Sequence, residues 1–167
     1  MRTTITILFI TLMGLTTQAQ DYNNAFKLSS GTFWGASYKK MLNQTSGFQT
    51  SFQIKSHEYQ LTALRIFHEP AFPATSSQWF VGYGYGTHLS YKTEISAWNA
   101  FRPLAPSNSY KGKFVSPGFD GYAALEYRFL KFPFVMAVEY MPNFEFFGPH
   151  FFRVNLNNLS FSFAYAF

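Results

Sequence analysis

Along most of the chain, apolar and polar residues alternate with a period of two, the pattern of a β-strand with two different faces. The last segment shows it best: one face carries Leu159, Phe161, Phe163, Tyr165 and Phe167. The opposite face carries Asn158, Ser160, Ser162, Ala164 and Ala166. After about residue 20 no stretch has the periodicity of an amphipathic helix. The pattern therefore predicts an all-β fold.

The alternation predicts eight strands, at 23–29, 32–42, 47–56, 60–69, 78–91, 118–130, 133–142 and 157–167. An even number of antiparallel strands places both ends of the sheet at one side, which in bacterial barrels faces the periplasm. The connections 43–46, 70–77 and 131–132 then lie on that side. The longest connection, 92–117, and the connection 143–156 lie on the extracellular side, where long loops belong.

The two faces differ in a way that separates membrane barrels from soluble ones. One face is apolar and aromatic, while the other is polar or carries very small residues such as the stripe Gly82, Gly84 and Gly86. Aromatic residues make up 22% of the chain and charged residues 13%, about half the usual charged share. That charge is too sparse to cover a soluble barrel. We therefore predict an eight-stranded antiparallel up-and-down transmembrane β-barrel, with the apolar face toward lipid.

The first residues are typical of an export signal. Arg2 precedes an apolar stretch from Ile5 to Leu15, and a short polar region ends at Ala19. We expect a cleaved signal peptide at 1–19 and a barrel at 20–167. Cleavage would remove Arg2 and leave 12 − 8 = +4 net charge. The basic residues are scattered, so the sequence indicates no nucleic-acid partner. The absence of cysteine excludes disulfides and thiolate metal sites.

Several stretches resemble small outer-membrane β-barrel proteins of Gram-negative bacteria, the OmpA/OmpX-like barrels. They are Leu61-Thr62-Ala63-Leu64 with His68-Glu69-Pro70-Ala71-Phe72, then Gly82 to His88, then Gly118 to Tyr122 continuing through Leu125-Glu126-Tyr127. The aromatic Phe167 on an alternating last segment resembles the signal by which such barrels are recognised for assembly. The resemblance implies an eight-stranded barrel in the outer membrane, with lipid and the assembly machinery as partners. It implies no reaction and no cofactor.

Charged residues on the polar face form the first candidate site. An eight-stranded barrel has an interior just wide enough for its own side chains. Charges there must be paired, so we expect a structural network of salt bridges. Its predicted members are Lys55, Arg65, His88, Asp120, Glu126, Arg128 and Glu139. Arg65 is included because the alternative would place it on lipid, at a cost of about 2–4 kcal/mol near the midplane. Glu126 and Glu139 lie on neighbouring predicted strands, which leaves acid–base chemistry as a second interpretation.

His88 and Ser90 form the second candidate, because residues two apart on a strand share a face. With Glu94 to orient the histidine, this pair could activate a serine nucleophile. Outer-membrane lipid A deacylases have a similar His-x-Ser on a barrel strand, but Tyr91 stands here where an asparagine commonly follows. Such an enzyme needs access from the bilayer, whereas the alternation turns both residues into the lumen. A lumen histidine hydrogen-bonded to its neighbours is the favoured interpretation.

The third candidate is an aromatic cluster in the connection 143–156. It consists of Phe144, Phe146, Phe147, Phe151 and Phe152, which would be unusual on a solvated loop. It could extend the barrel wall or bind a partner or ligand. No metal site is expected, because His57 and His68 fall at opposite ends of the predicted barrel.

Three functions remain open at this point. The leading one is a non-enzymatic outer-membrane protein that acts through its extracellular loops in a structural, adhesive or complex-forming role. The second is a lipid-modifying enzyme, which requires His88 and Ser90 to face the bilayer near the extracellular rim. The third is a soluble ligand-binding barrel of lipocalin type, which requires Phe161, Phe163 and Tyr165 to point inward.

Overall fold

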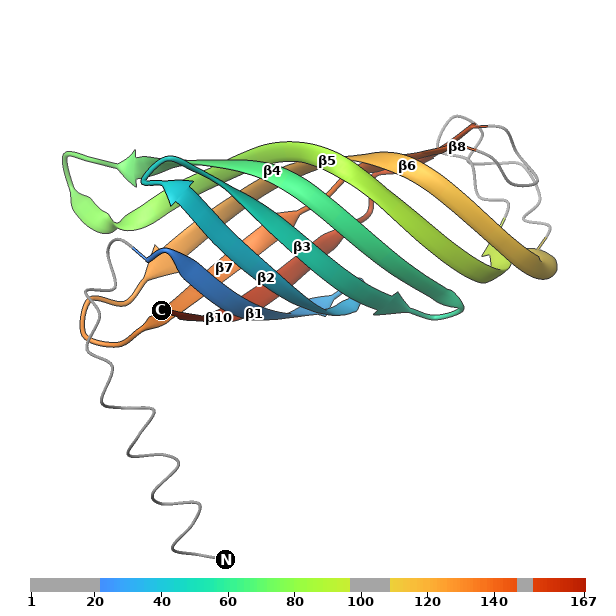
Figure 1. Cartoon of the computed structure of the whole chain (residues 1–167), viewed down its shortest axis with the longest axis horizontal. Coiled ribbons are helices and arrows are strands. Elements are labelled where there is room, and N and C mark those ends of the chain that lie inside the picture. The colour runs from blue at the N-terminus through green and yellow to red at the C-terminus, as the bar shows by residue number, and fades with distance from the viewer. Residues whose placement is uncertain (1–21, 97–108, 147–151) are drawn as a thin grey trace, which may run out of the picture.

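The structure is a computed structural model, and it describes residues 22–96, 109–146 and 152–167 (Figure 1). Within these ranges it contains ten antiparallel strands. They are β1 (Asn24–Gly31), β2 (Trp34–Asn43), β3 (Ser46–Lys55), β4 (Glu58–Phe72), β5 (Ser76–Ser96), β6 (Ser109–Arg128), β7 (Phe134–Tyr140), β8 (Asn143–Phe146), β9 (Phe152–Asn155) and β10 (Leu159–Ala166). No helix in the described ranges is long and apolar enough to cross a membrane.

The strands close into one barrel. The sheet runs β5-β4-β3-β2-β1-β10-β7-β6, and pairing between β5 and β6 closes the ring. β8 continues the course of β7 along β6, and β9 pairs with β8. The wall is therefore eight strands around, as the alternation predicts. The ring joins the two ends of the described chain, because Asn24 and Phe167 exchange backbone hydrogen bonds of 2.9 and 2.8 Å.

Two predicted loops are wrong in part. The predicted connection 92–117 is strand at both ends, since β5 continues to Ser96 and β6 begins at Ser109. Pro117 fits within β6 because the described pairing of β6 with β8 begins only at Gly118, which leaves one side of the strand without a ladder there. The predicted connection 143–156 contains the short strands β8 and β9. Pro142 separates β7 from β8, and its carbonyl accepts a hydrogen bond from the backbone of Gly121.

The two faces of the wall have opposite polarity. Phe161 and Phe163 are 48% and 46% exposed on the outside, whereas Ser162 between them is 1% exposed in the lumen. The same division runs through β1, where Phe26 and Leu28 point outward and Lys27 inward. This inverted arrangement excludes the lipocalin-type interpretation, which requires Phe161, Phe163 and Tyr165 to line the interior.

Both ends of the described chain lie at the same end of the barrel, together with the β2–β3, β4–β5 and β6–β7 connections (Figure 1). We call this the terminal end. The β1–β2 and β3–β4 turns, the end of β5 and the start of β6 lie at the opposite, far end, as does β8. This is the distribution that an even strand number predicts.

The glycine stripe on β5 faces the lumen and lets β4 and β5 lie close together. A Cβ on Gly84 would lie 2.3 Å from the backbone oxygen of Arg65, and one on Gly86 would lie 2.0 Å from that of Ala63. At Gly82 the nearest atoms are side chains of Tyr122, Ala124 and His68, at 3.4 to 3.5 Å. Gly82 therefore leaves space for lumen side chains, while close backbone packing explains Gly84 and Gly86.

Candidate functional site in the barrel lumen

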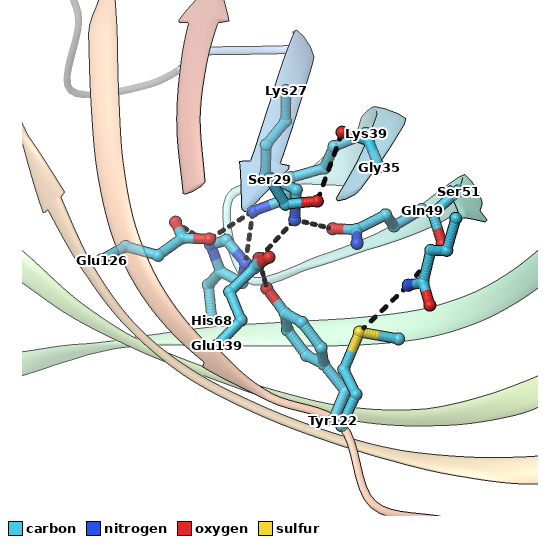
Figure 2. A network of polar contacts seen from close by, with 12 residues as sticks. Lys27, Ser29, Gly35, Lys39, Gln49, Ser51, His68, Tyr122, Glu126 and Glu139 are labelled. Atoms are coloured by element: carbon cyan, nitrogen blue, oxygen red, sulfur yellow. Dashed lines mark hydrogen bonds and ion pairs between the residues drawn. The ribbon is translucent and has the colours of Figure 1, made fainter. Parts of the chain in front are cut away.

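The lumen near the terminal end holds two buried ion pairs side by side. Lys27 on β1 pairs with Glu139 on β7, and Lys39 on β2 pairs with Glu126 on β6 (Figure 2). All four side chains are less than 5% exposed. They come from strands far apart in sequence, and only the closed ring brings them together. We call this group, with the residues bonded to it, the terminal-end network.

Further hydrogen bonds satisfy the polar atoms of these ions. The Lys27 ammonium donates to Gln49 Oε1 at 2.9 Å, and the Tyr122 hydroxyl donates to Glu139 Oε1 at 2.8 Å. Tyr22, which precedes β1, donates to Glu126 Oε2 at 3.4 Å. Burial beside Glu126 raises the pKa of the Tyr22 phenol well above its usual range, so this phenol stays a donor. The network is thus held by bonds from several directions, as buried charges require.

His68 and Arg128 complete the terminal-end network. Arg128 Nη2 lies 2.8 Å from His68 Nδ1 and 3.7 Å from Glu126 Oε2. The guanidinium also lies over the ring of Phe80, 3.6 Å from its centroid. On the opposite side of the imidazole, His68 Nε2 is 3.3 Å from the Lys39 ammonium. A neutral histidine accepts a hydrogen bond through only one of its two ring nitrogens, so only one of these two cations can donate to His68 at a time.

A second group of charges lies toward the far end, and we call it the far-end network. Lys92 on β5 pairs with Glu145 on β8 and, at 3.1 Å, with Glu58 on β4. His88 Nδ1 lies 2.8 Å from Asp120 Oδ2, and its Nε2 lies 3.8 Å from Glu145 Oε1. Gln60 donates to Asp120 at 3.5 Å. Three carboxylates therefore surround one ammonium and one imidazole.

Apolar side chains fill the lumen between the two networks. Leu64 and Ile66 point inward from β4, and both are at most 1% exposed. Along β4 they lie between Thr62, which pairs with His88 in register, and His68 of the terminal-end network. Within the terminal-end network, a void lined by Tyr22, Lys27, Lys39 and Glu126 has a volume of about 10 Å³. That is room for about one water molecule. The described side chains thus fill the interior rather than line a channel.

The structure brings together five of the seven predicted lumen charges and places two elsewhere. His88, Asp120, Glu126, Arg128 and Glu139 are all buried in the lumen. Lys55 is exposed at the far-end rim, because it is the last residue of β3 before the turn. Arg65 points outward, because its neighbours Leu64 and Ile66 occupy the inward positions of β4. The prediction of these two residues as network members is therefore wrong.

Sequence reasoning missed six Lys, His and Glu members of the two networks: Lys27, Lys39, Glu58, His68, Lys92 and Glu145. Alternation could have found Lys27, because it lies between the outward residues Phe26 and Leu28 on a predicted strand. Lys39 lies between Tyr38 and a second lysine, Lys40, so the pattern there is weaker. Lys92 and Glu145 lie in predicted connections that the structure shows to be strand. The alternation therefore could not predict that their side chains face the lumen.

The predicted catalytic constellation is not formed. His88 and Ser90 both face the lumen, as the alternation predicts, and both are buried. The Ser90 hydroxyl donates to the backbone oxygen of Ser116 at 3.1 Å, and the carboxylate beside His88 is that of Asp120. Glu94 lies instead near His57, with 3.9 Å between His57 Nε2 and its carboxylate. The lipid-enzyme interpretation required His88 and Ser90 to face the bilayer, and they do not.

The described part of the aromatic cluster forms wall rather than loop. Phe144 on β8 and Phe152 on β9 stack with ring centroids 6.0 Å apart, and Phe146 packs edge-on against Phe119 at 5.7 Å. Phe147 and Phe151 lie outside the described residues. No group of three or more His, Cys, Asp or Glu in the described ranges is arranged to hold a metal ion. His57 lies at the β3–β4 turn of the far end, and His68 lies in the terminal-end network.

Comparison with known proteins identifies the fold. No family model matches the chain, and no curated protein sequence matches it. Among solved structures, the barrel is similar to the crystal structure of the N-terminal β-barrel domain of OprF from Pseudomonas aeruginosa. The match has a TM-score of 0.56 and 12% sequence identity, and it covers 87% of this chain and 98% of that domain. The chain is thus an all-β, closed eight-stranded antiparallel barrel with the same architecture as that domain.

Proposed function

We propose that this protein is a non-enzymatic outer-membrane β-barrel with a sealed lumen, which acts in a structural, adhesive or complex-forming role through its far end. The observation that carries the proposal is the inverted polarity of the wall. Large apolar side chains such as Trp34, Leu61 and Tyr85 are 60 to 70% exposed, while the interior is polar and charged. Water disfavours such an exterior, whereas a bilayer favours it.

The closed hydrogen-bond ring supports insertion into lipid. In a bilayer every backbone polar group must be satisfied within the protein, and a barrel achieves this because it has no free edge in the hydrocarbon region. Here β1 pairs with β10 from Ala25 to Gly31, which seals the last seam. The predicted signal peptide and the position of Phe167 at the terminal end agree with export and assembly in the outer membrane. We propose lipid and the assembly machinery as the partners on this route.

The bonding of the lumen groups supports a role without catalysis. Lys27, Lys39 and Lys92 each make an ion pair with a buried carboxylate, and Ser90 is bonded to a backbone oxygen. Groups bonded in this way hold the wall together and are not accessible to a lipid substrate. Contact with other molecules is then left to the outer surface, and we place a protein partner at the far-end connections.

Substitution of Phe163 by Asp tests the membrane barrel. Phe163 lies mid-strand on β10 and faces outward, so a carboxylate there would face hydrocarbon. We expect the variant to insert into phospholipid vesicles much less than the wild type, measured by heat-modifiable gel mobility and protection from trypsin. Leu130→Asp is the matched control, because Leu130 is similarly exposed but lies in the β6–β7 turn. Equal insertion of wild type and Phe163→Asp would contradict the proposal.

A further inference from the structure

One arginine side chain, Arg65, lies on the outer, apolar face of the barrel. Arg65 on β4 points outward between the inward residues Leu64 and Ile66. Its guanidinium lies over the ring of Phe48, with 4.6 Å to the centroid, and 5.6 Å from the centroid of Phe67. No carboxylate within the described residues forms an ion pair with it. A charge on a surface that faces lipid is unfavourable unless the side chain reaches the interface or a counter-charge.

The side chain of Arg65 runs toward the terminal end. Its Nη2 donates to Ser46 Oγ at 3.1 Å, and Ser46 is the first residue of β3, directly after the β2–β3 turn. Ser46 is two residues nearer the turn than Phe48, which pairs with Arg65 in register. The guanidinium is therefore directed along the wall toward the β2–β3 turn, and long basic side chains avoid the hydrocarbon by reaching in this way toward the lipid headgroups.

A second cation lies in the same row. Lys40 on β2 pairs in register with Phe48 on β3, and Phe48 pairs with Arg65 on β4. Lys40 and Arg65 are thus two strand spacings apart, about 10 Å between Cα atoms. Lys40 is exposed, and among the described residues no carboxylate pairs with it. Two long side chains at this separation can reach one anion from both sides of the Phe48 ring.

We propose that Arg65 and Lys40 form a site for the phosphate of a membrane phospholipid, with Phe48 and Phe67 against the first carbons of its chains. Ser46 is buried and donates its hydroxyl to Asn43 Oδ1, so it positions the guanidinium by accepting from it. Three features select this ligand. A guanidinium matches the geometry of phosphate oxygens, an ammonium adds a second positive charge, and the site opens onto an apolar wall that suits acyl chains. The site rests on the proposed function, since a phospholipid reaches this face only if the barrel lies in a membrane.

Native mass spectrometry of the full chain, folded in detergent and titrated with dioleoylphosphatidylglycerol, tests the site. We expect Arg65→Gln to weaken lipid binding about tenfold, because a charge-assisted hydrogen bond to phosphate is lost. Lys40→Gln should weaken it less, and since Lys40 is exposed this variant should fold as the wild type does. Lys55→Gln is the matched control, as an exposed lysine at the far end, and it should bind as the wild type does.

Two further arms identify the ligand. Dioleoylglycerol, which has the same chains without phosphate, should not bind, and inorganic phosphate should compete only weakly with the lipid. Effective competition by inorganic phosphate would show a free-anion site and overturn the lipid assignment. Unchanged binding in both Arg65→Gln and Lys40→Gln would overturn the site itself. Failure of the wild type to insert into vesicles refutes the proposed function, whereas insertion with binding that is independent of both residues refutes this inference alone.

Discussion

At the scale of single residues, the stability of the barrel depends on buried ion pairs in which neither partner can be removed alone at low cost. Lys27 and Glu139 are both nearly completely buried, and each is the main counter-charge of the other. Removing one partner leaves an uncompensated ion in the interior, whereas removing both leaves an apolar gap. These two cases differ greatly in free energy, because the cost of a lone buried charge exceeds the net value of the pair.

This asymmetry gives a test by double-mutant cycle. Lys27→Met should lower the free energy of unfolding by about 3–5 kcal/mol, because Glu139 loses its ion pair. The double variant with Glu139→Met should be more stable than the sum of the single effects allows. Urea titration in lipid vesicles, followed by tryptophan fluorescence, measures both, with Lys55→Met as the exposed control. Strict additivity would mean that the two residues do not act as a pair.

The residue scale also shows where sequence reasoning succeeds and where it fails. Alternation places Glu126, Arg128 and Glu139 in the lumen, because each lies between outward apolar or aromatic residues, and it places Asp120 there in the same register. It could not place Arg65, which we assigned inward on the cost of an arginine in lipid. The structure satisfies that cost differently, by directing the side chain to Ser46 over aromatic rings. Side-chain direction along a wall is not encoded in a period of two.

At the scale of strands, the glycines of β5 and β6 set how closely neighbouring segments pack. A Cβ on Gly118 would lie 2.2 Å from the backbone oxygen of Phe144 and 2.4 Å from Cε1 of His88. A Cβ on Gly82 would meet only ordinary contacts, at 3.4 Å and beyond. The two positions look alike in sequence, since both face the lumen on a strand.

We therefore expect opposite results from the same substitution. Gly118→Ala should lower the free energy of unfolding by about 1–3 kcal/mol, since β8 or the His88 ring must move. Gly82→Ala should change it by less than about 1 kcal/mol. Thermal unfolding in detergent compares them directly. Equal destabilisation by both would show that loss of glycine itself, and not the approach of β8, determines the effect.

Strand ends were the least predictable feature at this scale. The order of the strands and the closed ring follow from alternation and parity. The extensions of β5 and β6 to Ser96 and Ser109 and the short strands β8 and β9 do not. They lie in segments rich in proline and aromatic residues, where local composition favours loops, and pairing with a neighbouring strand overrides that preference.

At the scale of the whole molecule, the described side chains fill the interior of the barrel. Two charge networks and the apolar layer of Leu64 and Ile66 occupy it, and the void beside Lys27 has room for about one water molecule. We expect the wild type in a planar bilayer to give no stable open-pore conductance, with insertion verified by trypsin protection of the same preparation. Reproducible conductance steps from the folded protein would contradict a sealed lumen.

The ion pair between Lys27 and Glu139 also has a consequence for the order of events during folding. Its partners are 112 residues apart in sequence, and the pair between Lys39 and Glu126 spans 87. Such contacts form only after the entropy of closing a very long loop has been lost. Neighbouring hairpins can form early from local pairing, and with them the pair between Lys92 and Glu58, but Lys27 and Lys39 meet their partners only as the ring closes. Topologies dominated by contacts between residues distant in sequence fold slowly. The lysines and glutamates of these two pairs therefore stay hydrated until the last seam of the barrel forms.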